Sequence, residues 1–289
     1  MGYRETYQAY LAAIEHYLGG LFLGDRPYGQ LQEAMRYSLL AGGKRVRPVL
    51  TCAFAELFGG EWEKAVPLGC ALELIHTYSL IHDDLPCMDD DDLRRGKPTC
   101  HKVYGETLAV LAGDALQPEA FAILAAAEGL SAQQRIDAVA VLARAAGGDG
   151  MVAGQVLDLD GKCRSREQVE LLHSLKTGAM IAAAVELGCV AANAAPEQRQ
   201  AARDYAWEVG LAFQIRDDML DVIADQTEFG KPIGSDREEG KTTFVDLIGL
   251  DGCEREVAAC TGRAKAALSD FPGNGFLLEL ADQLAERRK

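Results

Sequence analysis

Positive charge is scarce in this sequence, and long hydrophobic runs are missing. The 289 residues contain 29 Lys and Arg against 44 Asp and Glu, which gives a formal net charge of −15. This balance argues against nucleic acid as a partner, because binding to its phosphate backbone depends on basic residues. No stretch reaches the ~18 consecutive apolar residues of a membrane span. Residues 1–5 are polar and lack the apolar core of a signal peptide. We therefore expect no integral membrane segment.

Cysteine pairs and domain linkers are missing as well. None of the eight cysteines belongs to a C-x-x-C pair, and most lie in apolar helical segments. This favours buried free thiols in a reducing cytoplasm over disulfides or zinc sites. Hydrophobic residues make up 48% and charged residues 25%, as in an ordinary globular protein.

Alternating strand patterns are hard to find, and helical periodicity dominates. The sequence therefore predicts an all-α fold of about ten or more helices. We expect a polar loop at residues 89–99 and a mobile surface loop at residues 225–241. The predicted helices cover residues 3–23, 28–40, 49–58, 62–84, 104–128, 132–146, 151–160, 166–192, 196–223, 243–250, 254–269 and 275–288.

Two clusters of aspartates stand out against these apolar helices. One comprises residues 83, 84 and 89–92, and the other residues 217, 218 and 221. A carboxylate in apolar surroundings is costly unless a positive charge compensates it, and no run of Lys or Arg beside either cluster is long enough to neutralise all its charges. Oxygen ligands favour Mg²⁺, which usually completes its shell with water and substrate phosphates. The clusters therefore predict a phosphorylated substrate held through magnesium.

Helical spacing places each cluster on one face of its helix. Gln214, Asp217 and Asp221 follow an i, i+3, i+7 pattern, surrounded by apolar residues. These apolar neighbours favour metal ligation over a solvated acidic surface.

The first cluster follows the same spacing with His76, Ser79 and Asp83. Pro86 then ends the helix, so that Asp89 can fold back toward Asp83. Acids at a helix C-terminus oppose the macrodipole, which again favours a functional explanation.

Basic residues occur in groups that match these clusters. Together they supply enough charge for two diphosphates, one bound through magnesium and one bound directly. These residues are Lys44, Arg45, Arg47, Arg94, Arg95, Lys176, Lys231 and Lys241.

Several segments, in this order, resemble the trans-isoprenyl diphosphate synthases, most closely the bacterial farnesyl diphosphate synthase (geranyltranstransferase) type. The resemblance covers almost the whole chain. It is carried by Gly-Gly-Lys-Arg-Val-Arg-Pro at 42–48, the Asp-rich segment 82–99, Gly-Asp-Ala-Leu at 113–116, Gly-Gln at 154–155, Lys-Thr-Gly at 176–178, and Phe-Gln-Ile-Arg-Asp-Asp-Met-Leu-Asp at 213–221.

The resemblance implies a single polyprenyl synthase domain over residues 1–289, with helices around a deep central cavity. It also implies a cytoplasmic homodimer that joins isopentenyl diphosphate to the allylic substrates dimethylallyl and geranyl diphosphate. About three Mg²⁺ ions would stabilise the departing diphosphate, with Mn²⁺ as an alternative metal. We find no evident side-chain base, so the departing diphosphate is the expected proton acceptor. The loop 225–241 and the tail 287–288 are candidates for excluding water.

The resemblance also implies a role for each matched residue. The implied metal ligands are Asp83, Asp89 and Asp217, supported by Asp84, Asp218 and Asp221. The implied contacts on the side of the allylic diphosphate are Arg94, Lys176, Thr177, Gln214, Lys231 and Lys241. Isopentenyl diphosphate would be held by Lys44, Arg47, His76 and Arg95.

The residues that precede the first cluster on its helix predict the length of the product. Ser79 lies one turn, about 6 Å, below Asp83, and Tyr78 lies beside it. A bulky aromatic there acts as a floor in the family, and the insertion Pro86-Cys87 is similar to bacterial farnesyl synthases. These features favour a C15 product over C20.

Other functions remain open at this point. A geranylgeranyl (C20) or geranyl diphosphate synthase would share the motifs. A terpene cyclase would need an Asn/Ser/Glu-type second motif, and the Asp-Asp pairs do not suit a head-to-head condensing enzyme. A non-catalytic synthase subunit should have lost acidic ligands, yet this chain keeps them.

Overall fold

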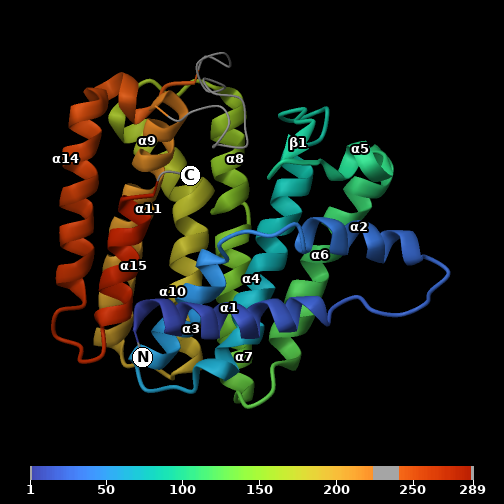
Figure 1. Ribbon diagram of the computed structural model, residues 1–289, viewed down its shortest axis with the longest axis horizontal. Coiled ribbons are helices and arrows are strands. Elements are labelled where there is room, and N and C mark those ends of the chain that lie inside the picture. Colours follow the sequence, from blue (N-terminus) through green and yellow to red (C-terminus); the bar gives the residue numbers. More distant parts are fainter. Residues whose placement is uncertain (1, 224–240, 288–289) are drawn as a thin grey trace.

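Helices make up almost all of the regular structure in the computed structural model, which describes residues 2–223 and 241–287 (Figure 1). This confirms the predicted all-α fold. The helices are α1 (Tyr3–Gly19), α2 (Gly29–Leu39), α3 (Val46–Leu57), α4 (Trp62–Asp83), α5 (Cys100–Tyr104), α6 (Glu106–Ala126), α7 (Ala132–Ala146), α8 (Met151–Asp160), α9 (Arg166–His173), the π-helical turn η1 (Ser174–Gly178), α10 (Ala179–Ala191), α11 (Pro196–Ile223), α14 (Phe244–Ala267) and α15 (Gly275–Ala285).

Helix α4 lies at the centre of the fold and is apolar on nearly all sides. Leu68, Leu72 and Leu74 are fully buried, as expected of a helix surrounded by other helices. It packs against α1, α3, α6 and α10, and α10 also packs against α11. The two helices that carry the acidic clusters are therefore connected through α10. Figure 1 shows that both helices end at the same end of the molecule.

The predicted helix over residues 104–128 is wrong at its start. The chain forms two helices there, α5 and α6, separated by Gly105 with φ of +84°. That conformation is strained for residues with a side chain but accessible to glycine. The predicted helix at residues 166–192 is confirmed as a continuous helical segment, Arg166–Ala191, in which the π-helical turn η1 lies between α9 and α10.

The predicted division between residues 243–250 and 254–269 is confirmed, because α14 consists of two helical segments that meet at a kink at Gly249, where φ is 69° and ψ is 166°. The loop at residues 89–99 contains a small antiparallel hairpin of β1 (Leu93–Arg94) and β2 (Lys97–Pro98). Its turn residues Arg95 and Gly96 both have positive φ, as a tight two-residue hairpin turn requires.

The first and last helices end earlier than predicted, at Gly19 and Ala285.

Residues 224–240 lie outside the described part of the chain, so the predicted loop there and Lys231 receive no structural account. Two helical segments, Glu106–Ala126 and Arg166–Ala191, have the length and hydropathy of a membrane span. Core helices of water-soluble proteins have the same properties, and half of the apolar window of Arg166–Ala191 is buried inside the protein.

Candidate active site

The first acidic cluster forms a turn around the end of α4. Asp83 is the last residue of the helix, and the chain after Pro86 reverses direction. The backbone N–H of Asp89 donates to the carbonyl oxygen of Asp83 at 2.9 Å. The predicted return of Asp89 toward Asp83 is therefore confirmed.

The carboxyl group of Asp83 lies in an environment that disfavours its charge. Burial raises its pKa to about 6, and the neighbouring acids Asp89 and Asp84 add to this rise. Lys176 and Arg94 oppose the rise but do not cancel it. A cation bound at this cluster would stabilise the ionised carboxylate.

Asp84 is already paired with a basic residue. It is buried, and Arg94 donates to it from Nε at 2.6 Å. Arg94 also reaches Asp91 at 3.2 Å. Both Asp84 and Arg94 therefore stabilise the hairpin on the end of α4, in addition to the roles that the resemblance implies for them.

The second acidic cluster, on α11, is covered by the C-terminal end of the described chain. Asp217 forms an ion pair with Arg287, whose guanidinium lies 3.7 Å from the centre of the Phe213 ring. Arg216 holds this segment by donating to the carbonyl oxygen of Arg287 at 3.0 Å. Burial raises the pKa of Asp217 even though Arg287 lowers it.

Asp218 holds the start of α14. Its carboxylate accepts a hydrogen bond from the backbone N–H of Phe244 at 2.7 Å and lies 3.8 Å from Nε2 of His173. The other ring nitrogen of His173 contacts Gln214 at 3.1 Å. Asp221, the third acid of the cluster, is buried as well. The sequence did not indicate this use of Asp218, because its partners lie on α9 and α14.

Another acidic residue, Asp158 on α8, binds two of the three lysines that the resemblance assigns to the allylic diphosphate; the third, Lys231, lies outside the described residues. Its Oδ2 atom lies 2.7 Å from Nζ of Lys176 and 3.0 Å from Nζ of Lys241. Burial alone would raise the pKa of Asp158, but the two ammonium groups outweigh it and lower the pKa. Sequence reasoning missed Asp158; the only available signal was its place four residues after Gly154.

The glycine of the Gly-Gln motif lets α8 approach η1 closely. A Cβ atom at Gly154 would lie 2.5 Å from Cα of Lys176, a distance at which the two carbon atoms would clash. Gly154 therefore brings Asp158 within reach of Lys176.

The basic motif at residues 42–48 divides into structural and cavity-facing residues. Arg45 is buried in ion pairs with Glu15 and Glu73, which fixes the loop before α3. Arg47 instead lines a cavity, and burial lowers its pKa. Lys44 is exposed.

His76 lies among these cations. Burial and the charges of Arg47 and Arg95 hold its pKa well below the usual range, so the imidazole is neutral at pH 7. Arg95 donates to the carbonyl oxygen of Gly42, which joins the hairpin to the basic loop. Of the predicted group, Arg47, His76 and Arg95 lie near enough to act on one another electrostatically, whereas Lys44 is exposed in the loop before α3.

A cavity of about 360 Å³ connects these groups. Its polar lining includes Arg47, His76, Asp83, Lys176 and Thr177. Its remaining lining is mainly apolar and aromatic, from Tyr78, Ser79, Leu80, His82, Met88, Met151, Val152, Val156 and Leu159, with Gln155 among them. The charge of Asp217 opposes the lowering of the Arg47 pKa, so the second acidic cluster acts electrostatically on a cation that lines the same cavity as Asp83.

Two polar atoms around this cavity are available to a ligand. Nε of Arg47 and Nε2 of Gln155 are buried and have no hydrogen-bond partner among the described residues. Buried donors without partners are uncommon in folded proteins. A ligand with an anionic head group would accept hydrogen bonds from these two donors, and its apolar tail would contact the apolar lining of the cavity.

The acidic clusters fit a metal that shares its ligands with a substrate. Within residues 2–223 and 241–287, no three or more His, Cys, Asp or Glu side chains come together as a metal-binding group. The site offers one or two carboxylates from each cluster. That donor set suits Mg²⁺, which keeps several waters and binds substrate phosphates.

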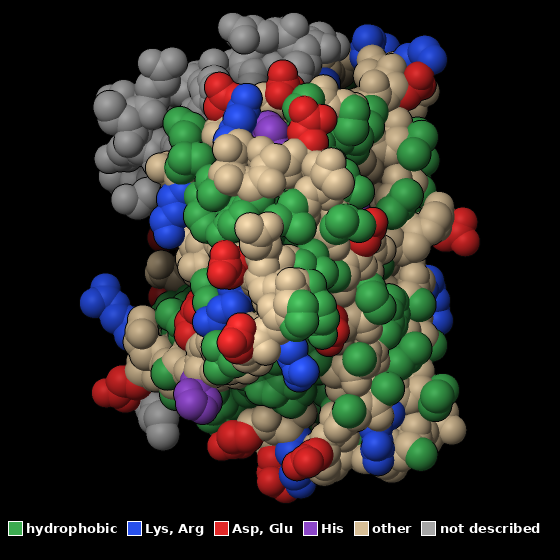
Figure 2. All heavy atoms as spheres, turned by 90° about the vertical axis from the view of Figure 1, so that its right-hand side faces the viewer, with side chains coloured by type: hydrophobic (Ala, Val, Ile, Leu, Met, Phe, Trp, Pro, Cys, Tyr) green, Lys and Arg blue, Asp and Glu red, His purple; other side chains and the backbone are tan. Residues whose placement is uncertain are grey.

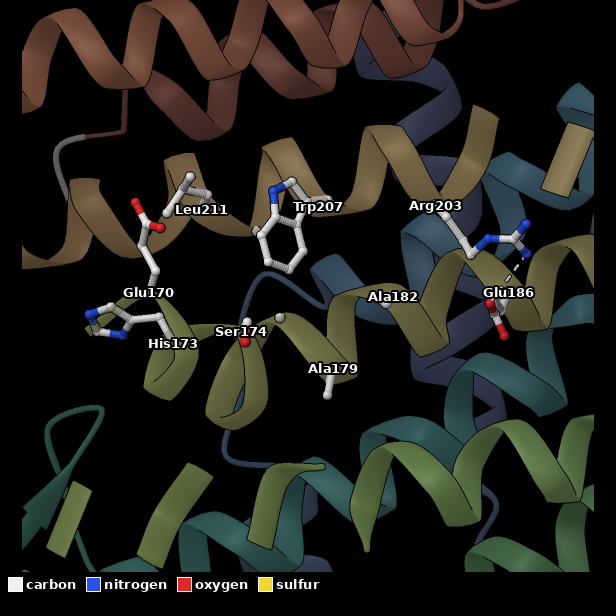
Figure 3. A pocket seen from close by; sticks show the side chains of 11 residues that line it. Glu170, His173, Ser174, Ala179, Ala182, Glu186, Arg203, Trp207 and Leu211 are labelled. Carbon is white, nitrogen blue, oxygen red and sulfur yellow. Dashed lines mark ion pairs between the residues drawn. The ribbon is translucent and has the colours of Figure 1, made fainter. Parts of the chain in front are cut away.

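A second cavity, of about 280 Å³, lies between α10 and α11 (Figure 3). The indole of Trp207 points from α11 toward the facing segment that carries Ser174, and Arg203 pairs with Glu186 at 3.7 Å. His173 is at its border. Asp217 lines neither cavity, but Asp83 lines the larger one and not this one, so the larger cavity is the candidate active site.

Comparison with known proteins agrees with this geometry. The polyprenyl synthetase family model matches residues 29–270. The chain is 43% identical to the farnesyl diphosphate synthase of Bacillus subtilis, over 89% of this chain and 88% of that protein. It is 47% identical to the chloroplastic geranylgeranyl pyrophosphate synthase of Capsicum annuum, over 89% of this chain and 71% of that protein. The crystal structure of an FPP/GFPP synthase from Zymomonas mobilis superposes with a TM-score of 0.87 at 36% identity, covering 98% of each chain.

Proposed function

The chain belongs to the polyprenyl synthetase family, and we propose that it is a magnesium-dependent prenyltransferase that makes (2E,6E)-farnesyl diphosphate. It would condense isopentenyl diphosphate with dimethylallyl diphosphate and then with geranyl diphosphate, head to tail. The observation that carries the proposal is the cavity that Asp83 lines together with the cations Arg47 and Lys176 and with mainly apolar side chains. The chain would act as a single domain over residues 1–289.

The proposed reaction begins with departure of the allylic diphosphate. Lys176 and Lys241, already held together by Asp158, would bind that diphosphate through charge-assisted hydrogen bonds. When bound at Asp83, Asp89 and Asp217, Mg²⁺ would neutralise the charge that develops on the leaving group.

The second substrate, isopentenyl diphosphate, would lie against the cations around the start of α3. Arg47 and the neutral His76 would donate hydrogen bonds to its diphosphate. Its double bond would then attack the allylic carbon, and the departing diphosphate would accept the proton. The apolar lining of the cavity would keep water away from the developing cation.

A C15 product is supported by the position of Tyr78. This residue is 7% exposed and lines the cavity one turn below Asp83. Its ring would block an elongating chain after the second condensation. A C20 product is the second candidate, because a geranylgeranyl pyrophosphate synthase is among the similar proteins.

A homodimer and a cytoplasmic location complete the proposal. Exposed apolar side chains on α5 and α6 support a protein partner, since Val103, Val110 and Leu111 are 46%, 38% and 49% exposed. Figure 2 shows hydrophobic side chains spread over one side of the molecule. All eight cysteines are free thiols, which fits a reducing compartment. Sedimentation of the purified protein would test the dimer.

The proposal is tested by incubating the protein with radiolabelled isopentenyl diphosphate and dimethylallyl diphosphate, with and without Mg²⁺. We expect labelled C15 diphosphate only when Mg²⁺ is present. A C20 product would support the second candidate. No product under any condition would reject both candidates and favour a non-catalytic subunit.

A further inference from the structure

Two aromatic rings in the lining of the cavity are in contact with each other. Tyr78 and His82 lie one turn apart on α4, and their ring centres are 5.6 Å apart with planes at 76°. Such an edge-to-face arrangement is a favourable aromatic contact. Both residues line the cavity below Asp83.

His82 is held from the other side by α6. Its Nε2 atom lies 3.1 Å from the carbonyl oxygen of Val110. Because a carbonyl oxygen only accepts, Nε2 carries the proton in this contact. The carboxylate of Asp114 lies 4.0 Å from the same nitrogen. The imidazole is therefore oriented by α6, which packs against α4.

Gly113 provides the space for this imidazole. A Cβ atom at Gly113 would lie 2.5 Å from Cδ2 of His82. The backbone of Gly113 is helical, so this glycine is needed for the close approach and not for its φ angle. It is the first residue of the Gly-Asp-Ala-Leu motif, to which we have assigned no role.

We propose that His82, which packs against Gly113 and is hydrogen-bonded to Val110, is a positioning residue. It holds the Tyr78 ring across the cavity and so sets product length. This inference rests on the proposed C15 activity. With the imidazole in place, the Tyr78 ring cannot turn toward α6. Without it, the ring can turn into the vacated space, and the cavity deepens along α4.

The test compares product lengths of Tyr78→Ala, His82→Ala, Gly113→Ala and the double variant Tyr78→Ala/His82→Ala. In His82→Ala and Gly113→Ala we expect the C20:C15 ratio to rise about tenfold or more, the change that one pocket-filling group produces. Because His82 acts through Tyr78, the double variant should make the same products as Tyr78→Ala. Additive lengthening in the double variant would overturn the positioning role.

Gly262→Ala is the matched control, since a Cβ there meets nothing within 4 Å in the middle of α14. It should keep the wild-type product. If Gly113→Ala does not fold, judged by circular dichroism, His82→Ala and the double variant still decide the question.

The wild-type product separates the two proposals. A wild-type enzyme that already releases C20 would contradict the C15 proposal before any variant is considered. If the wild type releases C15 and His82→Ala also stops at C15, the inference about His82 is wrong while the proposed function stands.

Discussion

The guanidinium of Arg287 forms an ion pair with the carboxylate of Asp217, so a side chain near the C-terminus supplies positive charge at the second acidic cluster. The Arg287 side chain is 10% exposed, and it also donates to the carbonyl oxygen of Phe213 at 3.0 Å. A metal ion that binds Asp217 must compete with this arginine. The tail predicted to exclude water therefore contacts a proposed metal ligand directly.

Replacement of Arg287 by Gln should strengthen metal binding to the substrate-free protein. Loss of a charged hydrogen bond worth about 1.5 kcal/mol corresponds to roughly tenfold in the dissociation constant. Binding of Mn²⁺, followed by electron paramagnetic resonance without substrate, measures this directly. Arg263→Gln is the control, because Arg263 pairs with Glu208 instead of an acid of either cluster. Unchanged Mn²⁺ affinity in Arg287→Gln would show that the ion pair does not compete with the metal.

Asp83→Ala and Asp217→Ala should each reduce kcat by about 10²-fold or more, because each removes a carboxylate that binds the charge-stabilising metal. Helix content, measured by circular dichroism, should stay at the wild-type level. Asp160→Ala is the control, since Asp160 is an exposed residue that pairs with Lys162. Near-normal turnover in either cluster variant would refute the assignment of its aspartate.

Asp158→Asn should affect the two substrates unequally. Lys176 and Lys241 would lose the carboxylate that holds them together. We expect kcat/KM for the allylic diphosphate to fall about tenfold, with little change in KM for isopentenyl diphosphate. Steady-state kinetics with each substrate varied in turn measures the difference. An equal loss for both substrates would instead point to a general structural role for Asp158.

Metal binding at the first cluster should depend on pH. Burial raises the pKa of Asp83 from 3.8 to about 6, so the metal-free carboxyl is protonated below that pH. Mg²⁺ binds the ionised form, and its affinity should fall by up to about tenfold per pH unit below pH 6. Calorimetric titration with Mg²⁺ between pH 5 and 8 would show this step. The Asp83→Asn variant should lack it, and a step that persists in this variant belongs to another group.

The same pKa has a consequence for folding. The pKa of Asp83 is higher in the folded than in the unfolded chain, so the folded state binds more protons between pH 4 and 6. The contribution of Asp83 to stability is therefore present at low pH and is lost as the pH rises through about 6. Bound metal would reverse this dependence, because it stabilises the ionised carboxylate.

Local patterns along the chain determined the fold class and the core of the site. The periodicity of apolar residues revealed helices such as α7, α8 and α11 with their observed limits. The i, i+3, i+7 spacing around Asp83 and Asp217 is a property of helix geometry alone. Even the return of Asp89 to Asp83 followed from one nearby proline. Such features need only interactions between residues a few positions apart.

The tertiary structure decided which charges meet. Lys241 and Asp158 are 83 positions apart, and Asp218 and Phe244 are 26 apart. Arg287, the partner of Asp217, comes after both α14 and α15 in the sequence. No local pattern encodes these pairs, because they depend on how helices pack against each other. Gly113 and Gly154 permit that packing, and only the folded chain shows which side chains fill the space they leave.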